Sequence, residues 1–175
     1  MTMPFDGSTA GYPEGRPRVR PLHSPADPSA AYFREVAQFV ALHLGRAPGV
    51  LWPEHDHPPL GDGADDGEDP AAAPDLDAFA ARIAAATGLA AGPGRVGAPP
   101  GHLLVHQIAG AATWDITGVG GDGQGASLRY RLRAGEVLYV PDGWSRTAEP
   151  ARDARWAVFV LAPEGSAAPD QPATG

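Results

Sequence analysis

The spacing of the hydrophobic residues changes at Gly101, and this change constrains the fold more than any other feature of the sequence. Before Gly101, two stretches carry apolar residues every three or four positions, as amphipathic helices do. After it, apolar and polar residues alternate in short runs that are separated by Gly-rich or Pro-Asp-Gly turns. Two helices followed by five strands predict a mostly β domain with flanking helices, an antiparallel sandwich or barrel.

Capping residues set the limits of both predicted helices. Asp27 is suited to cap the first helix, Pro28 to occupy its first position and Gly45 to end it. Asp75 is suited to cap the second helix and Gly88 to end it. The apolar stripes that these limits enclose are Phe33, Val36, Val40 and Leu44 in the first helix, and Leu76, Phe79 and Ile83 in the second.

The remaining segments divide the chain into one domain with loose ends. The predicted strands are 102–108, 112–119, 127–133, 136–141 and 155–163, with residues 50–52 as a further strand or plug. We expect a single domain over 28–163, a flexible arm over 1–27 and a disordered tail over 164–175. Residues 53–74 hold seven acids and no Arg, a composition typical of a disordered loop.

Charge and cysteine content exclude several classes of function. The formal net charge of −8 argues against nucleic acid or an anionic membrane as partner. The absence of cysteine excludes disulfides and thiolate chemistry. No apolar run reaches 18 residues and no secretion signal opens the chain, so we expect a cytoplasmic protein.

Two stretches resemble the JmjC-like, cupin-type oxygenases of the ribosomal-oxygenase branch. The stretch LRAGEVLYVPDGWSRTAE (132–149) resembles the closing motif of that family, and APPGHLLVHQIAGAATWDI (98–116) resembles its first motif. The matching positions are Pro99, Pro100, Gly101, Val105, Gln107, Gly110, Trp114, Gly135, Leu138, Tyr139, Pro141, Gly143 and Trp144. The resemblance implies a double-stranded β-helix barrel whose mouth holds Fe(II) and 2-oxoglutarate.

The iron ligands of that family are missing here. Arg146 stands at the position of the distant His ligand, and no His-x-Asp pair precedes Gln107. Because a guanidinium has no lone pair for a metal, we expect the standard iron site to be lost. His55 and His57 have ligand-like spacing and are candidates for another metal site, although they lie in the acidic loop, which gives metal ligands little rigid support.

The side chains expected to line a ligand site surround Arg146. Its guanidinium requires an anion or carbonyl groups, which a bound peptide or the nearby Asp142 or Glu149 would supply. Trp144 would share its face as an aromatic wall. Gln107 and His102 complete this candidate lining.

Two further groups leave alternatives open. His102 and His106 lie on one face of a strand, and we expect each to lie at the barrel mouth or on the surface. Either one could form an acid–base pair with Tyr139. Three arginines alternate along one predicted strand: Arg129, Arg131 and Arg133. They form either a solvated strand face or an edge that engages an acidic peptide or the chain's own acidic loop.

The hypothesis that follows is a non-catalytic, JmjC/cupin-like protein with a metal-free barrel mouth. It would bind a peptide or protein as an accessory factor, with peptide natural-product tailoring as one setting. One alternative is an Fe(II)/2-oxoglutarate-dependent hydroxylase with non-standard ligands. Another is a metal-free cupin isomerase or epimerase. A homodimer formed through a strand edge would compete with a peptide for the same surface.

Overall fold

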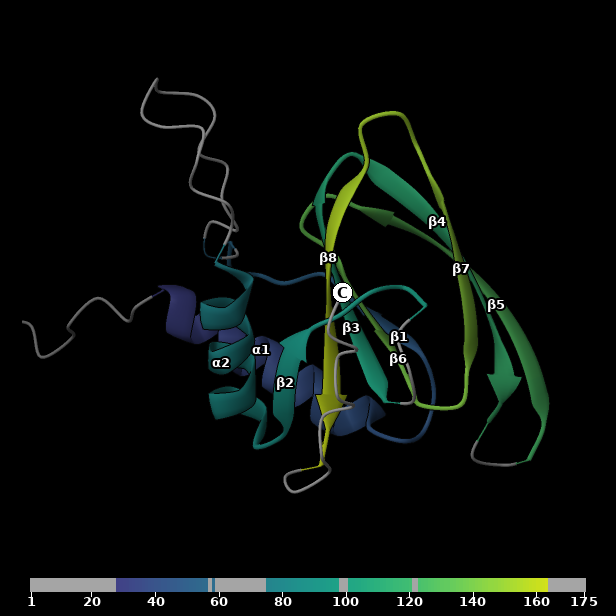
Figure 1. The fold of residues 1–175 in the computed structure, drawn as a ribbon, viewed down its shortest axis with the longest axis horizontal. Coiled ribbons are helices and arrows are strands. Elements are labelled where there is room, and N and C mark those ends of the chain that lie inside the picture. The colour runs from purple at the N-terminus through teal and green to yellow at the C-terminus, as the bar shows by residue number, and fades with distance from the viewer. Residues whose placement is uncertain (1–27, 57, 59–74, 98–100, 121–122, 164–175) are drawn as a thin grey trace, which may run out of the picture.

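The described residues of the computed structural model form two helices and two sheets. Figure 1 shows the helices on one side of the larger sheet and the smaller sheet on the other, so that three layers result. The structure describes residues 28–56, 58, 75–97, 101–120 and 123–163. The predicted arm over 1–27, most of the acidic loop and the predicted tail over 164–175 lie outside these residues.

Two antiparallel sheets form the β layers. The larger sheet, here sheet A, has the strand order β1-β6-β3-β8-β2, and the smaller sheet, here sheet B, has the order β5-β4-β7. The strand bounds are β1 Gly49–Leu51, β2 Ala90–Pro93, β3 His102–Ala109, β4 Ala111–Val119, β5 Gly125–Arg133, β6 Val137–Val140, β7 Ser145–Pro150 and β8 Arg155–Ala162. The predicted mostly β domain with flanking helices is confirmed. In the described part of the chain the sheets do not close into a barrel, so the structure does not confirm the predicted cupin barrel.

The helices α1 (Pro28–His43) and α2 (Leu76–Thr87) begin and end close to the positions that their capping residues predict. The Asp75 carboxylate accepts a hydrogen bond from the Ala78 N–H at 2.8 Å and caps α2. Gly88 ends this helix in the left-handed conformation, with φ of 70°, which glycine adopts without the steric cost of a Cβ.

Sheet A is buried on both faces. One face of its central strands packs on the helices through Leu104, Tyr139 and Phe159, while the helices contribute residues such as Phe33 and Ile83. The opposite face packs on sheet B through residues such as Leu103, Leu138 and Val158. The strands alternate between two apolar surroundings, which explains why β3, β6 and β8 read as nearly continuous hydrophobic runs.

Sheet B has one buried and one solvated face. Trp114, Ile116 and Leu132 are fully buried against sheet A. The residues that alternate with these buried side chains, such as Arg131 and Arg133 on either side of Leu132, point to solvent. This alternation positions the arginines of β5 on an exposed surface.

Candidate functional site

Arg146 lies on the inward face of β7, opposite Ile116 of β4. Its Nε donates a hydrogen bond to the Val96 carbonyl at 2.9 Å, and its Nη1 donates to the Trp144 carbonyl at 3.4 Å. Burial lowers the pKa of Arg146, and the charge of Asp142 acts in the opposite direction. Two backbone carbonyls accept hydrogen bonds from this guanidinium, and the contact with Val96 ties β7 to the segment that precedes β3.

Trp144 and Gln107 belong to the core between the sheets rather than to an accessible lining. The Trp144 ring packs directly against Gly118, where any Cβ would overlap it. Gln107 is fully buried, and its Nε2 donates to the carbonyls of Ala109 at 2.8 Å and Arg155 at 3.2 Å. The Gln107 amide therefore spans the irregular pairing of β3 with β8.

His102 and Tyr139 form the hydrogen-bonded pair that the sequence left open. The Tyr139 hydroxyl donates to His102 Nδ1 at 2.9 Å and accepts from the Gly45 N–H at 3.1 Å. The Asp142 N–H also donates to His102 Nδ1, at 3.1 Å. Because Nδ1 accepts from a backbone N–H, the ring is assigned as neutral with its proton on Nε2.

Burial favours the uncharged form of both side chains in this pair. Burial lowers the pKa of His102, with the charge of Asp142 acting in the opposite direction. Burial raises the pKa of Tyr139, so its hydroxyl stays protonated at neutral pH. Tyr139 is 0% exposed, and its hydroxyl joins the end of α1 to the turn between β6 and β7.

His106 faces the same helix layer as His102 but contacts a different tyrosine. The Tyr32 hydroxyl lies 3.3 Å from His106 Nδ1, and the two rings stack at 5.9 Å. His106 is only 1% exposed, so the prediction that it lines an accessible mouth or surface is wrong. It is buried beneath α1 because its strand is covered on this face.

His55 does not join a metal site among the described residues. Its Nδ1 contacts the Glu35 carboxylate of α1, which also accepts the Glu54 N–H at 2.9 Å. His57 lies outside the described residues. The part of the chain that the structure describes contains no group of three His, Asp or Glu side chains able to hold a metal ion. The described donors therefore do not fit the iron triad of the resembling family.

The arginines of β5 lie together on the solvated face of sheet B. Arg129, with a side chain 63% exposed, contacts Glu149 at 3.1 Å and Asp115 at 3.5 Å. Among the described residues, no hydrogen bond or ion pair engages the side chains of Arg131 and Arg133, which are both exposed. Two cationic side chains therefore project from one strand without an ion pair to any described side chain.

The main chain of β5 is open on one side, because this strand lies at an edge and pairs with β4 alone within the described residues. Ala134 N–H donates to the Gly110 carbonyl at 3.1 Å, and Gly120 N–H donates to the Gln124 carbonyl at 2.8 Å. Even-numbered residues therefore direct their main-chain groups toward β4. Those of Ser127, Arg129 and Arg131 point away from it. We call this row of outward main-chain groups over 125–131 the β5 edge.

Glu136 closes one end of the β5 edge. Its Oε2 accepts the Arg133 N–H at 2.9 Å, while its own N–H donates to the Arg133 carbonyl at 3.0 Å. Its Oε1 accepts the Trp52 Nε1–H at 2.6 Å. Trp52 is 70% exposed, so a fixed aromatic ring stands beside the end of the edge. Neither Glu136 nor Trp52 was predicted as a site residue, because the contact joins residues 84 positions apart.

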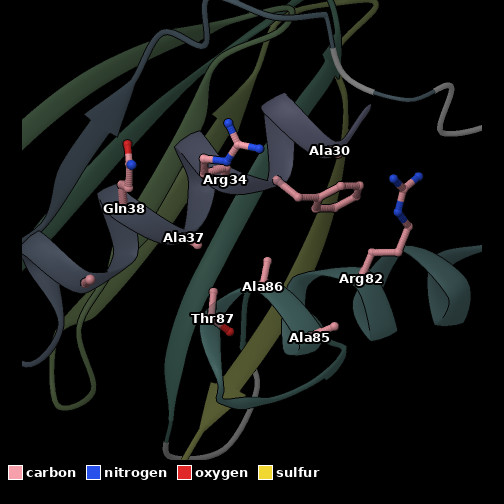
Figure 2. Close-up of a pocket in the computed structure, with 10 residues that line it drawn as sticks. Ala30, Arg34, Ala37, Gln38, Arg82, Ala85, Ala86 and Thr87 are labelled. Atoms are coloured by element: carbon pink, nitrogen blue, oxygen red, sulfur yellow. The ribbon is translucent and has the colours of Figure 1, made fainter. Parts of the chain in front are cut away.

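A second surface is a groove between the two helices (Figure 2), with a volume of about 640 Å³. Alanines of α1 and α2 and the Phe33 ring line it, with Arg34 and Arg82 among the polar residues. The Arg82 guanidinium lies 4.4 Å from the centre of the Phe33 ring, an attractive cation–π geometry. The groove offers side chains alone, whereas the β5 edge adds a row of directional main-chain groups.

No known protein-family model matches this chain, and no curated protein matches it significantly. Neither of the two described helices is long and apolar enough to cross a lipid bilayer.

Proposed function

We propose that this protein is a non-catalytic binding module that takes up an extended acidic peptide segment of a partner protein along the β5 edge. The observation that carries the proposal is the coincidence of two features at Arg129 and Arg131. Their main-chain groups point to the open edge, and their side chains stand on the adjacent solvated face. An added strand would gain main-chain hydrogen bonds from the first feature and charge selection from the second.

Charge also argues that the occupant is not a second copy of β5. Two β5 strands pairing edge to edge in antiparallel fashion, with Arg131 opposite Arg131, would place arginine beside arginine. Like charges directly opposite each other destabilise a pair of strands. An acidic strand in the same place would face Arg131 and Arg133 with opposite charge. The arginines therefore disfavour such self-pairing and favour an acidic partner.

The proposal includes a relationship to the JmjC-like cupin scaffold. Its support is the resemblance of the two motifs, together with two antiparallel sheets and flanking helices. Arg146 at the ligand position supports a scaffold whose use has moved from iron chemistry to binding.

Fluorescence anisotropy with a labelled nine-residue peptide, in which glutamate alternates with valine, tests the proposal. We expect saturable binding that weakens at least tenfold in the Arg131→Glu/Arg133→Glu variant. The matched control is Arg34→Glu/Arg95→Glu, which makes the same change in net charge at exposed positions away from β5. This control should bind nearly as the wild type does, apart from a small loss through long-range charge.

N-methylation of the peptide separates strand addition from simple charge attraction. A strand that joins the β5 edge uses the N–H of every second residue, so methylating one alternate set should abolish binding and methylating the other should not. Equal behaviour of both methylated peptides, or no binding of the unmethylated peptide in 50 mM salt, would overturn the proposal.

A further inference from the structure

We infer that Trp52 is a specificity-determining residue of the β5 edge, which selects an apolar or aromatic side chain at the end of the bound acidic segment that lies nearest Arg133. This inference rests on the proposed function and adds a second determinant to it. The recognised segment would carry acids at alternate positions and one bulky apolar residue at a defined end.

The first step of the argument is that the β5 edge has a fixed end. Both outward main-chain groups of Arg133 are already bonded to Glu136, its N–H at 2.9 Å and its carbonyl at 3.0 Å. An added strand therefore pairs with Arg131 and with residues before it, and stops where the Glu136 carboxylate stands.

The second step is that the exposed groups change at this end of the β5 edge, from cationic arginines to a carboxylate and an aromatic ring. Glu136 is a carboxylate, so it disfavours a further acid on the bound segment at the point where Arg131 and Arg133 cease to dominate. Beside it stands the Trp52 ring, which is 70% exposed and held through its Nε1–H at 2.6 Å from Glu136. An exposed tryptophan whose orientation is fixed by a hydrogen bond loses little further freedom on contact, which is the property of an anchor residue.

The third step is that the opposite end of the edge provides a built-in comparison. Val119 is 62% exposed and pairs with Gly125, at the start of β5. Both ends therefore display one exposed apolar side chain. Only Trp52 is joined, through Glu136, to the stop at Arg133.

The test uses three peptides with the same alternating acids: one ends in alanine at both termini, and the other two carry phenylalanine at the first or the last position. We expect one of the two phenylalanine peptides to bind about tenfold more tightly than the alanine peptide, and its end identifies the strand direction. Trp52→Ala should abolish this gain while leaving the affinity for the alanine peptide within twofold. The matched control Val119→Ala should retain the gain.

The outcomes separate this inference from the proposed function. If the alanine peptide does not bind the wild type, the proposed function fails and the inference fails with it. If the alanine peptide binds but phenylalanine adds nothing, or if its gain survives Trp52→Ala, the inference alone is overturned. A gain that disappears in Val119→Ala instead would place the determinant at the other end and would also overturn it.

Discussion

Sheets A and B are built from the same kind of antiparallel strand, yet they bury their residues differently. Sheet A lies between the helices and sheet B, and both of its faces are apolar. Sheet B presents one face and the edge strand β5 to solvent. The difference separates two roles: sheet A contributes side chains to both buried clusters of the core, whereas sheet B keeps charged and main-chain groups at the solvent-exposed surface.

The largest expected loss of stability comes from truncating a buried side chain of sheet A, and a side chain of sheet B provides the comparison. Phe159 is fully buried and stacks on Phe79 at 5.2 Å, so Phe159→Ala should lower the free energy of unfolding by about 3–5 kcal/mol. Tyr130 of β5 is half-buried, so Tyr130→Ala should cost clearly less. Urea unfolding monitored by circular dichroism measures both. Equal losses would contradict the conclusion that Phe159 of sheet A is more tightly packed than Tyr130 of sheet B.

A smaller loss of stability is expected at the contact between β4 and Trp144, the residue before β7. A Cβ on Gly118 would overlap the Trp144 ring, so Gly118→Ala should cost about 1–3 kcal/mol through overpacking. Gly125 has open space around it and serves as the matched control, with Gly125→Ala expected to leave stability within about 0.5 kcal/mol. Thermal unfolding of the two variants compares them. A neutral Gly118→Ala would mean that the buried face of sheet B is loosely packed.

The smallest effect concerns pH. Burial lowers the pKa of folded His102 beneath its unfolded value of about 6.5, so the unfolded state binds more protons in this range. Stability should therefore be complete above the unfolded pKa and decline as pH falls through it toward the lower folded pKa. The expected loss is about 1 kcal/mol, the net value of a typical hydrogen bond, because a protonated Nδ1 accepts from neither Tyr139 nor Asp142.

His102→Asn is the control for this titration, because it keeps an acceptor near Nδ1 but does not titrate. Asp142 lies next to His102, and the His43 ring lies 6.3 Å from Tyr139; both groups are present in the two proteins. The difference between the two curves of unfolding free energy against pH isolates His102. Superimposable curves would exclude this histidine as the source of the pH dependence.

Local signals predicted much of the fold. Capping residues such as Asp75 and Gly88 act within a few positions of the chain, and the alternation in β4 and β5 is set by one buried face. β2 and β7 were not among the predicted strands. β2, at Ala90–Pro93, is four residues of small side chains, and β7, at Ser145–Pro150, is largely polar. Both are strands because a neighbour supplies their hydrogen bonds, which no periodicity reveals.

The candidate site was predictable only where a single strand carries it. The row of Arg129, Arg131 and Arg133 is visible in the sequence, but its place at a sheet edge depends on strand order. Contacts between distant segments were not determined by the sequence. Arg146 with Val96 spans 50 positions and was not predicted, and Tyr139 with His102, which spans 37, was one of two pairings left open. Such contacts follow from how the layers stack, which is a property of the whole chain.

The Tyr139 hydroxyl has a consequence for how the molecule opens. It bonds the backbone just after α1 at Gly45 and, through His102, the turn that begins at Asp142. Neither segment separates from the other without breaking a hydrogen bond at this one atom or at the imidazole beside it. The end of the first helix and the turn before β7 therefore belong to one cooperative unit of local unfolding, although 97 positions separate them in the chain.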